Sequence, residues 1–165
     1  MTRICFHGAE STGKSTLARK LAMDLGCPVV REFGRTYAEV HGTEFAMADL
    51  LAIAWRQGQL MHEAAAQGPP LLLLDTDPLM TAAWAQMLFG EVPDELWAYP
   101  KADRYLLCGP DVPWVADGTR MFGSPEDRRR FAGIAEDVLV SAGVPYRKIT
   151  GSWDERERQA LAALA

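Results

Sequence analysis

Eight consecutive residues near the start of the chain have the types and the spacing needed to bind a polyphosphate. They fit the pattern G-x-x-x-x-G-K-S and are Gly8, Ala9, Glu10, Ser11, Thr12, Gly13, Lys14 and Ser15. In such a segment the glycines let backbone N–H groups turn toward phosphate oxygens, the lysine reaches the β- and γ-phosphates, and the last hydroxyl binds Mg²⁺. We therefore predict a phosphate and Mg²⁺ site here, extended by Thr16 in the turn that follows.

The residues on either side of this segment have the patterns of the strand and the helix that a P-loop requires. Residues 4–6 form an apolar run, and Leu17, Leu21 and Leu25 recur at helical spacing. A helix that begins at the loop places partial positive charge where a phosphate would bind. The alternative is a glycine-rich turn that binds nothing, and the correct pattern on both sides favours the P-loop.

Three carboxylates follow two further apolar segments. Residues 27–33 and 71–74 have the pattern of strands; Glu32 lies in the charged end of the first, and Asp75 and Asp77 follow the second. Because the carboxyl ends of parallel strands meet at one edge of a sheet, we expect these carboxylates to lie beside the P-loop.

Each of these carboxylates has a candidate role and an alternative one. Asp75 ends an apolar strand, the usual Walker B position, and is predicted to hold the water shell of the metal. Glu32 is predicted to orient or deprotonate a substrate hydroxyl; alternatively it pairs with Arg31 or Arg35. Arg35 would contact phosphate or substrate, or simply neutralise the carboxylates. Asp77 would bind a substrate hydroxyl or cap the helix that follows it.

A polar, glycine-containing stretch and the helix after it contain a second set of candidates. We expect residues 109–130 to form a mobile lid whose Arg120 and Arg128 close over the phosphates, because a guanidinium binds phosphate oxygens with two N–H groups and stays charged. Alternatively these arginines belong to a solvated helix face. Asp117 and Trp114 are expected at the substrate site, Trp114 by stacking on a planar base. Other aromatic residues that could stack there are Phe33, Tyr37, Trp55 and Trp84.

Composition excludes several classes of protein. The chain of 165 residues suits one domain, 1–165, and its net charge of −5 argues against a nucleic-acid partner. Three widely spaced cysteines favour free thiols in a reducing compartment. We see no leader or membrane-spanning run and expect a cytoplasmic protein; the oligomeric state is not predicted.

Apolar periodicity predicts strands that alternate with helices along the whole chain. The expected strands are 4–6, 27–33, 71–74, 104–108 and 146–149. The expected helices are 14–25, 34–40, 46–66, 78–88, 94–99, 125–142 and a last one opened by a capping box at 152–155. The all-aliphatic segment 71–74 indicates a strand buried on both faces. We therefore predict a doubly wound α/β fold with a parallel sheet.

Four motifs together resemble the ribosylnicotinamide kinase domain of the bacterial NadR proteins and the NadR-like ATPases. The motifs are the P-loop, residues 31–35 (REFGR), residues 75–77 (DTD) and residues 113–120 (PWVADGTR). The resemblance implies a P-loop nucleotide-kinase-like three-layer sandwich with the strand order 2-3-1-4-5. It also implies transfer of the ATP γ-phosphate to the 5′-hydroxyl of nicotinamide riboside, a small-molecule nucleoside substrate.

Two departures from this family and two other hypotheses bear on function. The adenylyltransferase and DNA-binding portions are not expected in this chain, and Arg31 stands where an aromatic residue would stack on nicotinamide. A kinase of another nucleoside or nucleotide therefore stays open, as does an ATP-binding regulatory module without an acceptor. A GTPase is disfavoured, because the chain contains no asparagine for a guanine-binding motif.

Overall fold

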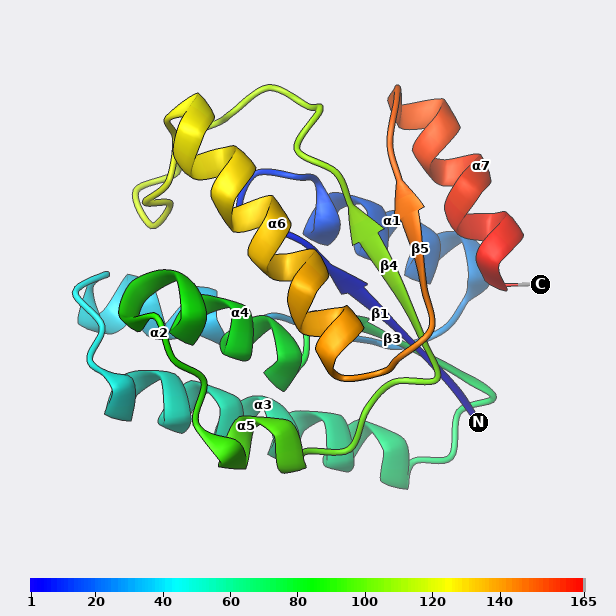
Figure 1. Cartoon of the computed structure of the whole chain (residues 1–165). Helices are drawn as coiled ribbons and strands as arrows, with labels where there is room; N and C mark the ends of the chain where they lie inside the picture. Colours follow the sequence, from blue (N-terminus) through cyan, green and yellow to red (C-terminus); the bar gives the residue numbers. More distant parts are fainter. Residues whose placement is uncertain (165) are drawn as a thin grey trace.

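Five parallel strands form the centre of the protein in a computed structural model that describes residues 1–164 (Figure 1). The strands are β1 (Thr2–His7), β2 (Val29–Val30), β3 (Leu71–Asp75), β4 (Arg104–Cys108) and β5 (Tyr146–Ile149). Their order across the sheet is β2-β3-β1-β4-β5, and each pair of neighbours is parallel. This confirms the predicted α/β class and the strand order 2-3-1-4-5.

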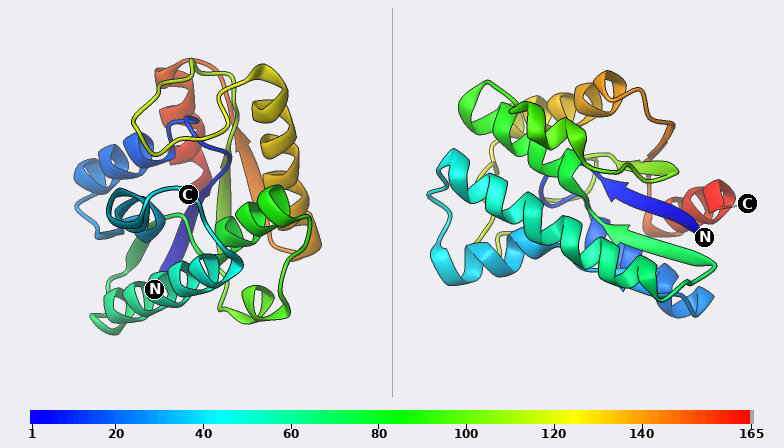
Figure 2. Two further views of the ribbon diagram at one scale, coloured as in Figure 1. Left: turned by 90° about the vertical axis from the view of Figure 1, so that its left-hand side faces the viewer. Right: turned by 90° about the horizontal axis from the view of Figure 1, so that it is seen from below.

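Helices connect the strands and cover both faces of the sheet. They are α1 (Lys14–Leu25), α2 (Phe33–His41), α3 (Met47–Ala66), α4 (Pro78–Phe89), α5 (Asp94–Ala98), α6 (Pro125–Ser141) and α7 (Trp153–Leu164). Helices α1 and α7 pack together on one face, whereas α3, α4 and α6 form a continuous layer on the other (Figures 1 and 2). The protein is therefore a three-layer sandwich. Among the described residues, no helix has the length and the apolar character needed to cross a membrane.

The two faces of each central strand belong to two separate hydrophobic cores. Leu72 and Leu74 of β3 pack with the α3–α4–α6 layer, while Leu73 packs with the α1–α7 layer. All three leucines are fully buried. Successive side chains of a strand point to opposite faces, so a strand covered on both sides needs an uninterrupted apolar run. The aliphatic segment 71–74 has this run because β3 lies between β1 and β2.

The second strand is much shorter than the predicted segment 27–33. Only Val29 and Val30 pair with β3. Beyond them, the side chain of Gln57 from α3 accepts a hydrogen bond from the Phe33 N–H at 2.8 Å and donates one to the Arg31 carbonyl at 3.2 Å. These backbone groups are thus satisfied by a helix side chain. Glu32 consequently lies at the N-cap position of α2 instead of in a strand.

The predicted helix ends have the expected local chemistry. Gly26 ends α1 in the left-handed conformation (φ 60°), and its N–H bonds to helix carbonyls. At the start of α7, the Glu155 carboxylate accepts from the Ser152 N–H at 2.8 Å, and the Ser152 hydroxyl accepts from the Glu155 N–H at 3.4 Å. This is the predicted capping box, which fixes where α7 begins.

Candidate active site

A cavity of about 460 Å³ opens where β1 and β3 end and brings most of the predicted site residues together. The predicted residues that line it are Gly8, Glu10, Ser11, Thr12, Gly13, Lys14, Ser15, Thr16, Glu32, Arg35, Asp75 and Arg120. Those that do not line it are Asp77, Trp114, Asp117 and Arg128. The cavity lies at the carboxyl ends of the strands, where ligands bind in open α/β sheets.

Both glycines of the P-loop are required by its conformation. Gly8 has φ 131°, and a β-carbon there would lie 2.5 Å from the carbonyl oxygen of Cys108 on β4. Gly13 has φ 84°, and its β-carbon would lie 2.5 Å from the indole ring of Trp153 on α7. A side chain at either position would combine backbone strain with a collision. The loop therefore keeps its backbone exposed to the cavity.

The Lys14 ammonium group is held at the P-loop by the loop itself. The Lys14 side chain is largely buried, with the residue 9% exposed, and its Nζ donates a hydrogen bond to the Ala9 carbonyl at 2.7 Å. The Thr12 hydroxyl donates to the same carbonyl at 2.8 Å. A positive charge on the floor of a cavity lined by backbone N–H groups is suited to attract a polyphosphate.

Asp75 and Ser15 have the character of a Mg²⁺ site that is completed by a nucleotide. Asp75 is 4% exposed, and its Oδ1 is buried without a hydrogen-bond partner. Ser15 lines the same cavity. Within residues 1–164 no cluster of three or more His, Cys, Asp or Glu side chains could hold a metal alone. Mg²⁺ commonly binds through one or two protein groups, several waters and substrate phosphates, so this donor set fits it.

Glu32 combines a cavity position with an unusual electrostatic environment. Although it occupies the N-cap position of α2, its side chain makes no capping hydrogen bond. Burial raises the pKa of the Glu32 carboxyl above its ordinary value, the Lys14 charge opposes this, and the negative charge of Asp75 adds to it. A carboxylate with a raised pKa and no internal partner at the helix end is suited to accept a proton from a substrate hydroxyl.

Asp77 is a core residue, although it lies only two positions beyond Asp75. Its Oδ1 accepts from the Leu79 N–H at 3.0 Å, and its Oδ2 accepts from the Tyr105 hydroxyl at 2.5 Å. It caps α4, with Pro78 in the first turn. Asp77 therefore takes the helix-capping position that was its alternative prediction, and it lies outside the cavity in which the substrate contact was expected. The physical reason is Thr76 (φ 75°), whose left-handed backbone separates the directions of the two aspartates.

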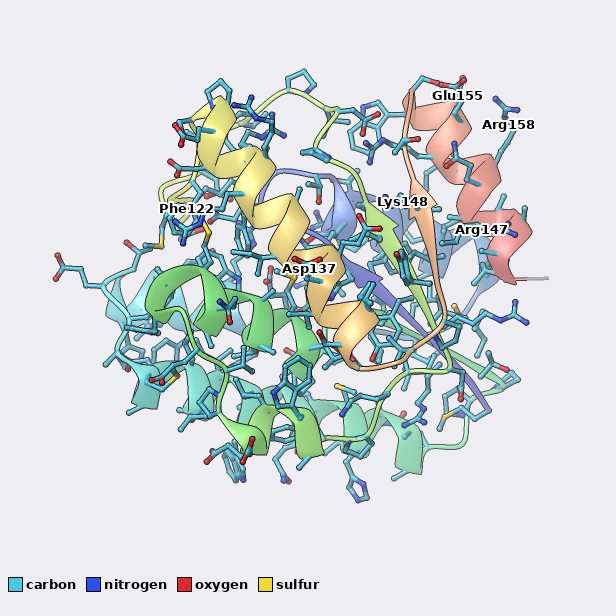
Figure 3. The ribbon with its side chains drawn as sticks, viewed as in Figure 1. Phe122, Asp137, Arg147, Lys148, Glu155 and Arg158 are labelled. Atoms are coloured by element: carbon cyan, nitrogen blue, oxygen red, sulfur yellow. The ribbon has the colours of Figure 1, made fainter. Side chains whose placement is uncertain are left out.

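The 109–124 loop crosses the P-loop, as the left view of Figure 2 shows. The Glu10 carboxylate accepts from the Phe122 N–H at 2.9 Å and from the Met121 N–H at 3.0 Å. The Ser11 hydroxyl accepts from the Val115 N–H at 2.9 Å. Figure 3 labels Phe122, whose ring lies 5.7 Å from that of Trp84 on α4. Two side chains of the P-loop therefore hold this loop over the cavity.

The two candidate arginines differ in position. Arg120 lines the cavity and donates to the Ser11 hydroxyl at 3.3 Å. Arg128, on α6, donates to the Val112 carbonyl at 2.9 Å and to the Ser11 carbonyl at 3.4 Å, and it does not line the cavity. Its guanidinium thus binds backbone carbonyls of the P-loop and of the 109–124 loop outside the cavity. Arg120 thus lies in the cavity where the phosphate contact is predicted, whereas Arg128 binds loop carbonyls outside it.

Asp117 links the acceptor side of the cavity to the 109–124 loop. Its carboxylate forms ion pairs with Arg35 of α2 and, at 3.2 Å, with Arg120. Burial opposes ionisation, but hydrogen bonds from Arg35 and Thr119 hold the pKa of Asp117 well below its usual range. Asp117 thus pairs with two arginines that line the cavity and does not line it itself, and its contact with substrate stays a prediction.

Trp114 also lies outside the cavity. Its ring packs against Gly123 and stands 5.8 Å from the Arg128 guanidinium, on the outer side of the loop. The aromatic residues that do line the cavity are Phe45 and Trp84, whose rings are 6.3 Å apart. Trp114 is therefore not among the rings at the cavity, where its stacking role was expected. Trp84, one of the other aromatic candidates, is in the right place because α4 faces the end of β1.

Sequence reasoning missed several residues of the cavity wall, of which three bear on its shape and polarity. Phe45 comes from the turn before α3, Gln57 from α3 and Thr76 from the end of β3. Gln57 is 2% exposed, and a signal for it was available, because it interrupts the apolar stripe of a buried helix. No residue pattern announces the positive φ of Thr76, since threonine rarely takes that conformation.

Comparisons with known proteins agree with this architecture. Residues 3–156 match AAA_28, a family of AAA domains. The trifunctional NAD biosynthesis/regulator protein NadR of Escherichia coli K12 is 31% identical over 153 residues, which are 88% of this chain. The chain spans only 37% of the length of that relative.

Solved structures show the same fold. A crystal structure of NadR protein in complex with nicotinamide riboside (NR) superposes with a TM-score of 0.82 at 24% identity, over 99% of this chain and 50% of that one. Deoxyadenosine kinase from M. mycoides has a TM-score of 0.71 at 11% identity, over 99% and 98% of the two chains. The chain therefore shares the P-loop kinase-like fold of these structures. Because the family match extends over nearly the whole chain, the protein belongs to the AAA_28 family of AAA domains and is a homologue of the NadR proteins.

Proposed function

We propose that the protein is an ATP-dependent kinase that transfers the γ-phosphate to the 5′-hydroxyl of nicotinamide riboside and so forms nicotinamide mononucleotide. One observation carries this proposal: a P-loop lysine and a carboxylate of raised pKa, Glu32, line the same cavity. A module that only hydrolyses ATP would also use a carboxylate to orient water, and the aromatic rings of Phe45 and Trp84 in the same cavity are what favour a nucleoside acceptor. The similarity to NadR, one structure of which contains nicotinamide riboside, supports this choice of acceptor.

In this proposal the residues divide the work of an in-line transfer. Lys14 and the N–H groups of the P-loop hold the β- and γ-phosphates, while Arg120 neutralises charge that develops on the transferred group. Ser15 and Asp75 hold Mg²⁺ and its waters, and Mg²⁺ supplies further charge neutralisation. The 5′-hydroxyl oxygen attacks phosphorus as its proton passes to Glu32, and the bond to the β-phosphate oxygen breaks.

Phe45 and Trp84 are the partners we propose for the nicotinamide ring. Their rings line the acceptor side of the cavity, and base–aromatic stacking stabilises such complexes by about 1–3 kcal/mol per base. Arg31 lies at the same cavity with an exposed side chain, so its charge stays solvated. A positively charged pyridinium can therefore bind to the aromatic wall although Arg31 is nearby.

A kinase of a different nucleoside is the second candidate, and Arg31 is the observation that favours it. A cation at the rim of an acceptor cavity attracts an anionic or neutral ligand better than a cationic one. The protein would then share chemistry with deoxyadenosine kinase, whose fold it matches.

An ATP-consumption assay with a panel of nucleosides tests these proposals. We expect nicotinamide riboside to raise turnover above the ATP-only rate and to give a phosphorylated product of the mass of nicotinamide mononucleotide. Lys14→Ala, purified in parallel, controls for contaminating kinases. If only another nucleoside raises turnover, that nucleoside is the acceptor instead of nicotinamide riboside. If none of the nucleosides raises turnover, the kinase proposal itself is overturned.

A further inference from the structure

Arg156, on the first turn of α7, is a fully buried arginine that the residues of the proposed reaction do not explain. It is 0% exposed, and its guanidinium donates to four acceptors. Nε donates to the Gly151 carbonyl at 2.9 Å, and Nη1 donates to the Thr12 carbonyl at 3.0 Å. Nη2 donates to the Gly109 carbonyl at 3.0 Å and to the Asp111 carboxylate. One side chain thus joins the P-loop, the start of the 109–124 loop and the β5–α7 turn.

Stability alone is a poor reason for burying this charge. Removing a guanidinium from water has a large desolvation cost, and a buried ion pair seldom contributes more than apolar packing of the same volume. The charged partner, Asp111, has a side chain that is 41% exposed, so the attraction between them is weakened by solvent. The other partners are all backbone carbonyls. The arrangement is therefore suited to fixing backbone directions.

The Thr12 contact determines where the next N–H points. In a trans peptide the C=O and the following N–H are antiparallel and coplanar, and residues 1–164 contain no cis peptide. When Arg156 holds the Thr12 carbonyl, the Gly13 N–H points in the opposite direction. Within the described residues this N–H has no hydrogen-bond acceptor, and Gly13 lines the cavity at the start of α1.

The same turn of α7 restrains Gly13 from a second direction. The Trp153 ring lies against the α-carbon of Gly13, where any β-carbon would meet the indole at 2.5 Å. The Arg156 guanidinium stands 5.9 Å from that ring. The left-handed Gly13 backbone (φ 84°) is consequently held by Trp153 on its α-carbon and by Arg156 on the preceding carbonyl.

We propose that Arg156 is a positioning residue for the phosphate site, because it fixes the Thr12–Gly13 peptide so that the Gly13 N–H is directed at the polyphosphate. This inference rests on the proposed function in taking a polyphosphate as the donor ligand, and its test takes nicotinamide riboside as the control ligand. In this inference α7 contributes to the affinity of the P-loop for polyphosphate.

Calorimetric binding of inorganic tripolyphosphate with Mg²⁺, compared with binding of nicotinamide riboside, tests the inference. Arg156→Lys keeps the charge, but one ammonium group cannot reach all four acceptors. We expect it to weaken tripolyphosphate binding about tenfold, the effect of one lost hydrogen bond to a charged ligand. Binding of nicotinamide riboside should stay unchanged, whereas a general structural defect would weaken both.

Two arginines provide matched controls. Arg104 donates to the Ala163 carbonyl at 2.7 Å, so Arg104→Lys removes an arginine–backbone bond to the same helix away from the P-loop. Arg158, also on α7, is exposed and points away from the protein (Figure 3). We expect Arg104→Lys and Arg158→Lys to bind tripolyphosphate as the wild type does.

The outcomes separate the inference from the proposed function. Equal tripolyphosphate affinity for wild type and Arg156→Lys would overturn the inference alone. An absence of tripolyphosphate binding by the wild type would overturn both. If Arg156→Lys does not fold, Arg156→Gln takes its place, because it removes the buried charge and keeps an N–H donor. We expect the same weakening of tripolyphosphate binding. An unchanged tripolyphosphate affinity of Arg156→Gln would count against the inference.

Discussion

The phosphate side of the cavity comes from one continuous segment, whereas its other side is assembled from parts that are distant in sequence. Residues 8–16 form the phosphate side, and their shape follows from two glycines with positive φ and the helix that begins behind them. The acceptor side takes Glu32 from α2, Gln57 from α3 and Trp84 from α4. Local backbone geometry, held in place by Trp153 and Arg156 of α7, builds the first side, and packing of helices on the sheet builds the second.

This difference has a functional consequence. A substitution on the phosphate side should impair transfer to every acceptor, because the donor is common to all of them. A substitution on the acceptor side should change the rate or the affinity for the nucleoside while ATP still binds. Each of the following predictions tests one part of this contrast.

The largest loss is expected for Lys14→Ala. Lys14 is the charge on the floor of the cavity, and a preorganised charge lost from a site of phosphoryl transfer lowers turnover by about 10³-fold. Steady-state kinetics with several acceptors should show the same loss for each. Lys20→Ala, which removes an exposed lysine paired with Asp24, is the control and should retain activity. A loss that depends on the acceptor would break the contrast between the two sides.

Glu32→Gln should lower kcat by about 10²-fold with ATP affinity nearly unchanged. The amide has the same size as the carboxylate but cannot take the proton of the attacking hydroxyl. Rapid-quench measurement of product formation, together with ATP titration, separates the two effects. Glu39→Gln, at an exposed glutamate that also lines the cavity, is the matched control. A near-wild-type kcat for Glu32→Gln would remove this residue from the mechanism.

Trp84→Leu should raise KM for the nucleoside about tenfold and leave KM for ATP unchanged, because a stacking partner of the base is lost. Trp84 also packs 4.8 Å from Phe131. Trp97→Leu, on α5, removes a half-buried tryptophan that packs on the same core outside the cavity, and it controls for lost packing. Equal changes in both KM values would assign Trp84 to structure alone.

Asp77→Asn should have the smallest effect on turnover and a distinct effect on stability. Burial raises the pKa of Asp77 from 3.8 to about 6, although the bonds from Tyr105 and Leu79 oppose this. The folded state therefore binds the proton more tightly than the unfolded state. The stability from this group is complete below pH 4 and is lost as pH rises through 6, by about 3 kcal/mol.

Denaturant unfolding of both proteins at pH 4.5 and pH 7.5 measures this effect. The wild type should lose more stability than Asp77→Asn between these values, and kcat of the variant should stay close to that of the wild type. Asp94→Asn, at an exposed aspartate in the first turn of α5, controls for the loss of a surface carboxylate. If Asp77→Asn lowers kcat and leaves the pH dependence of stability unchanged, Asp77 would act at the substrate site instead of in the core.

Most elements of the fold could be predicted from the chain, and the failures have particular causes. Strands β1, β3 and β4 have apolar runs that mark them, and Gly26 and the capping box at 152–155 mark helix ends. The second strand was overestimated because a side chain, Gln57, replaced a strand as the partner of its backbone. Such a long-range partner has no local signature in residues 27–33.

The candidate site divides in the same way. Asp75 could be predicted because it ends a buried strand, but Asp77 could not be separated from it without the positive φ of Thr76. Trp114 and Trp84 are equally aromatic, and only the path of the 109–124 loop and the packing of α4 place the first outside the cavity and the second within it. No sequence motif around Arg156 predicts that its side chain is buried.

The sequence by itself determined the P-loop, the parallel α/β fold and the strand ends at which a site could form, since each depends on neighbouring residues or on one repeating pattern. Only the tertiary structure decided which of the carboxylates and aromatic rings line the cavity, how the 109–124 loop lies on Glu10 and Ser11, and where Arg156 points. The physical reason is that a side chain takes its direction and its partners from backbone torsions and from elements that pack against it across the fold.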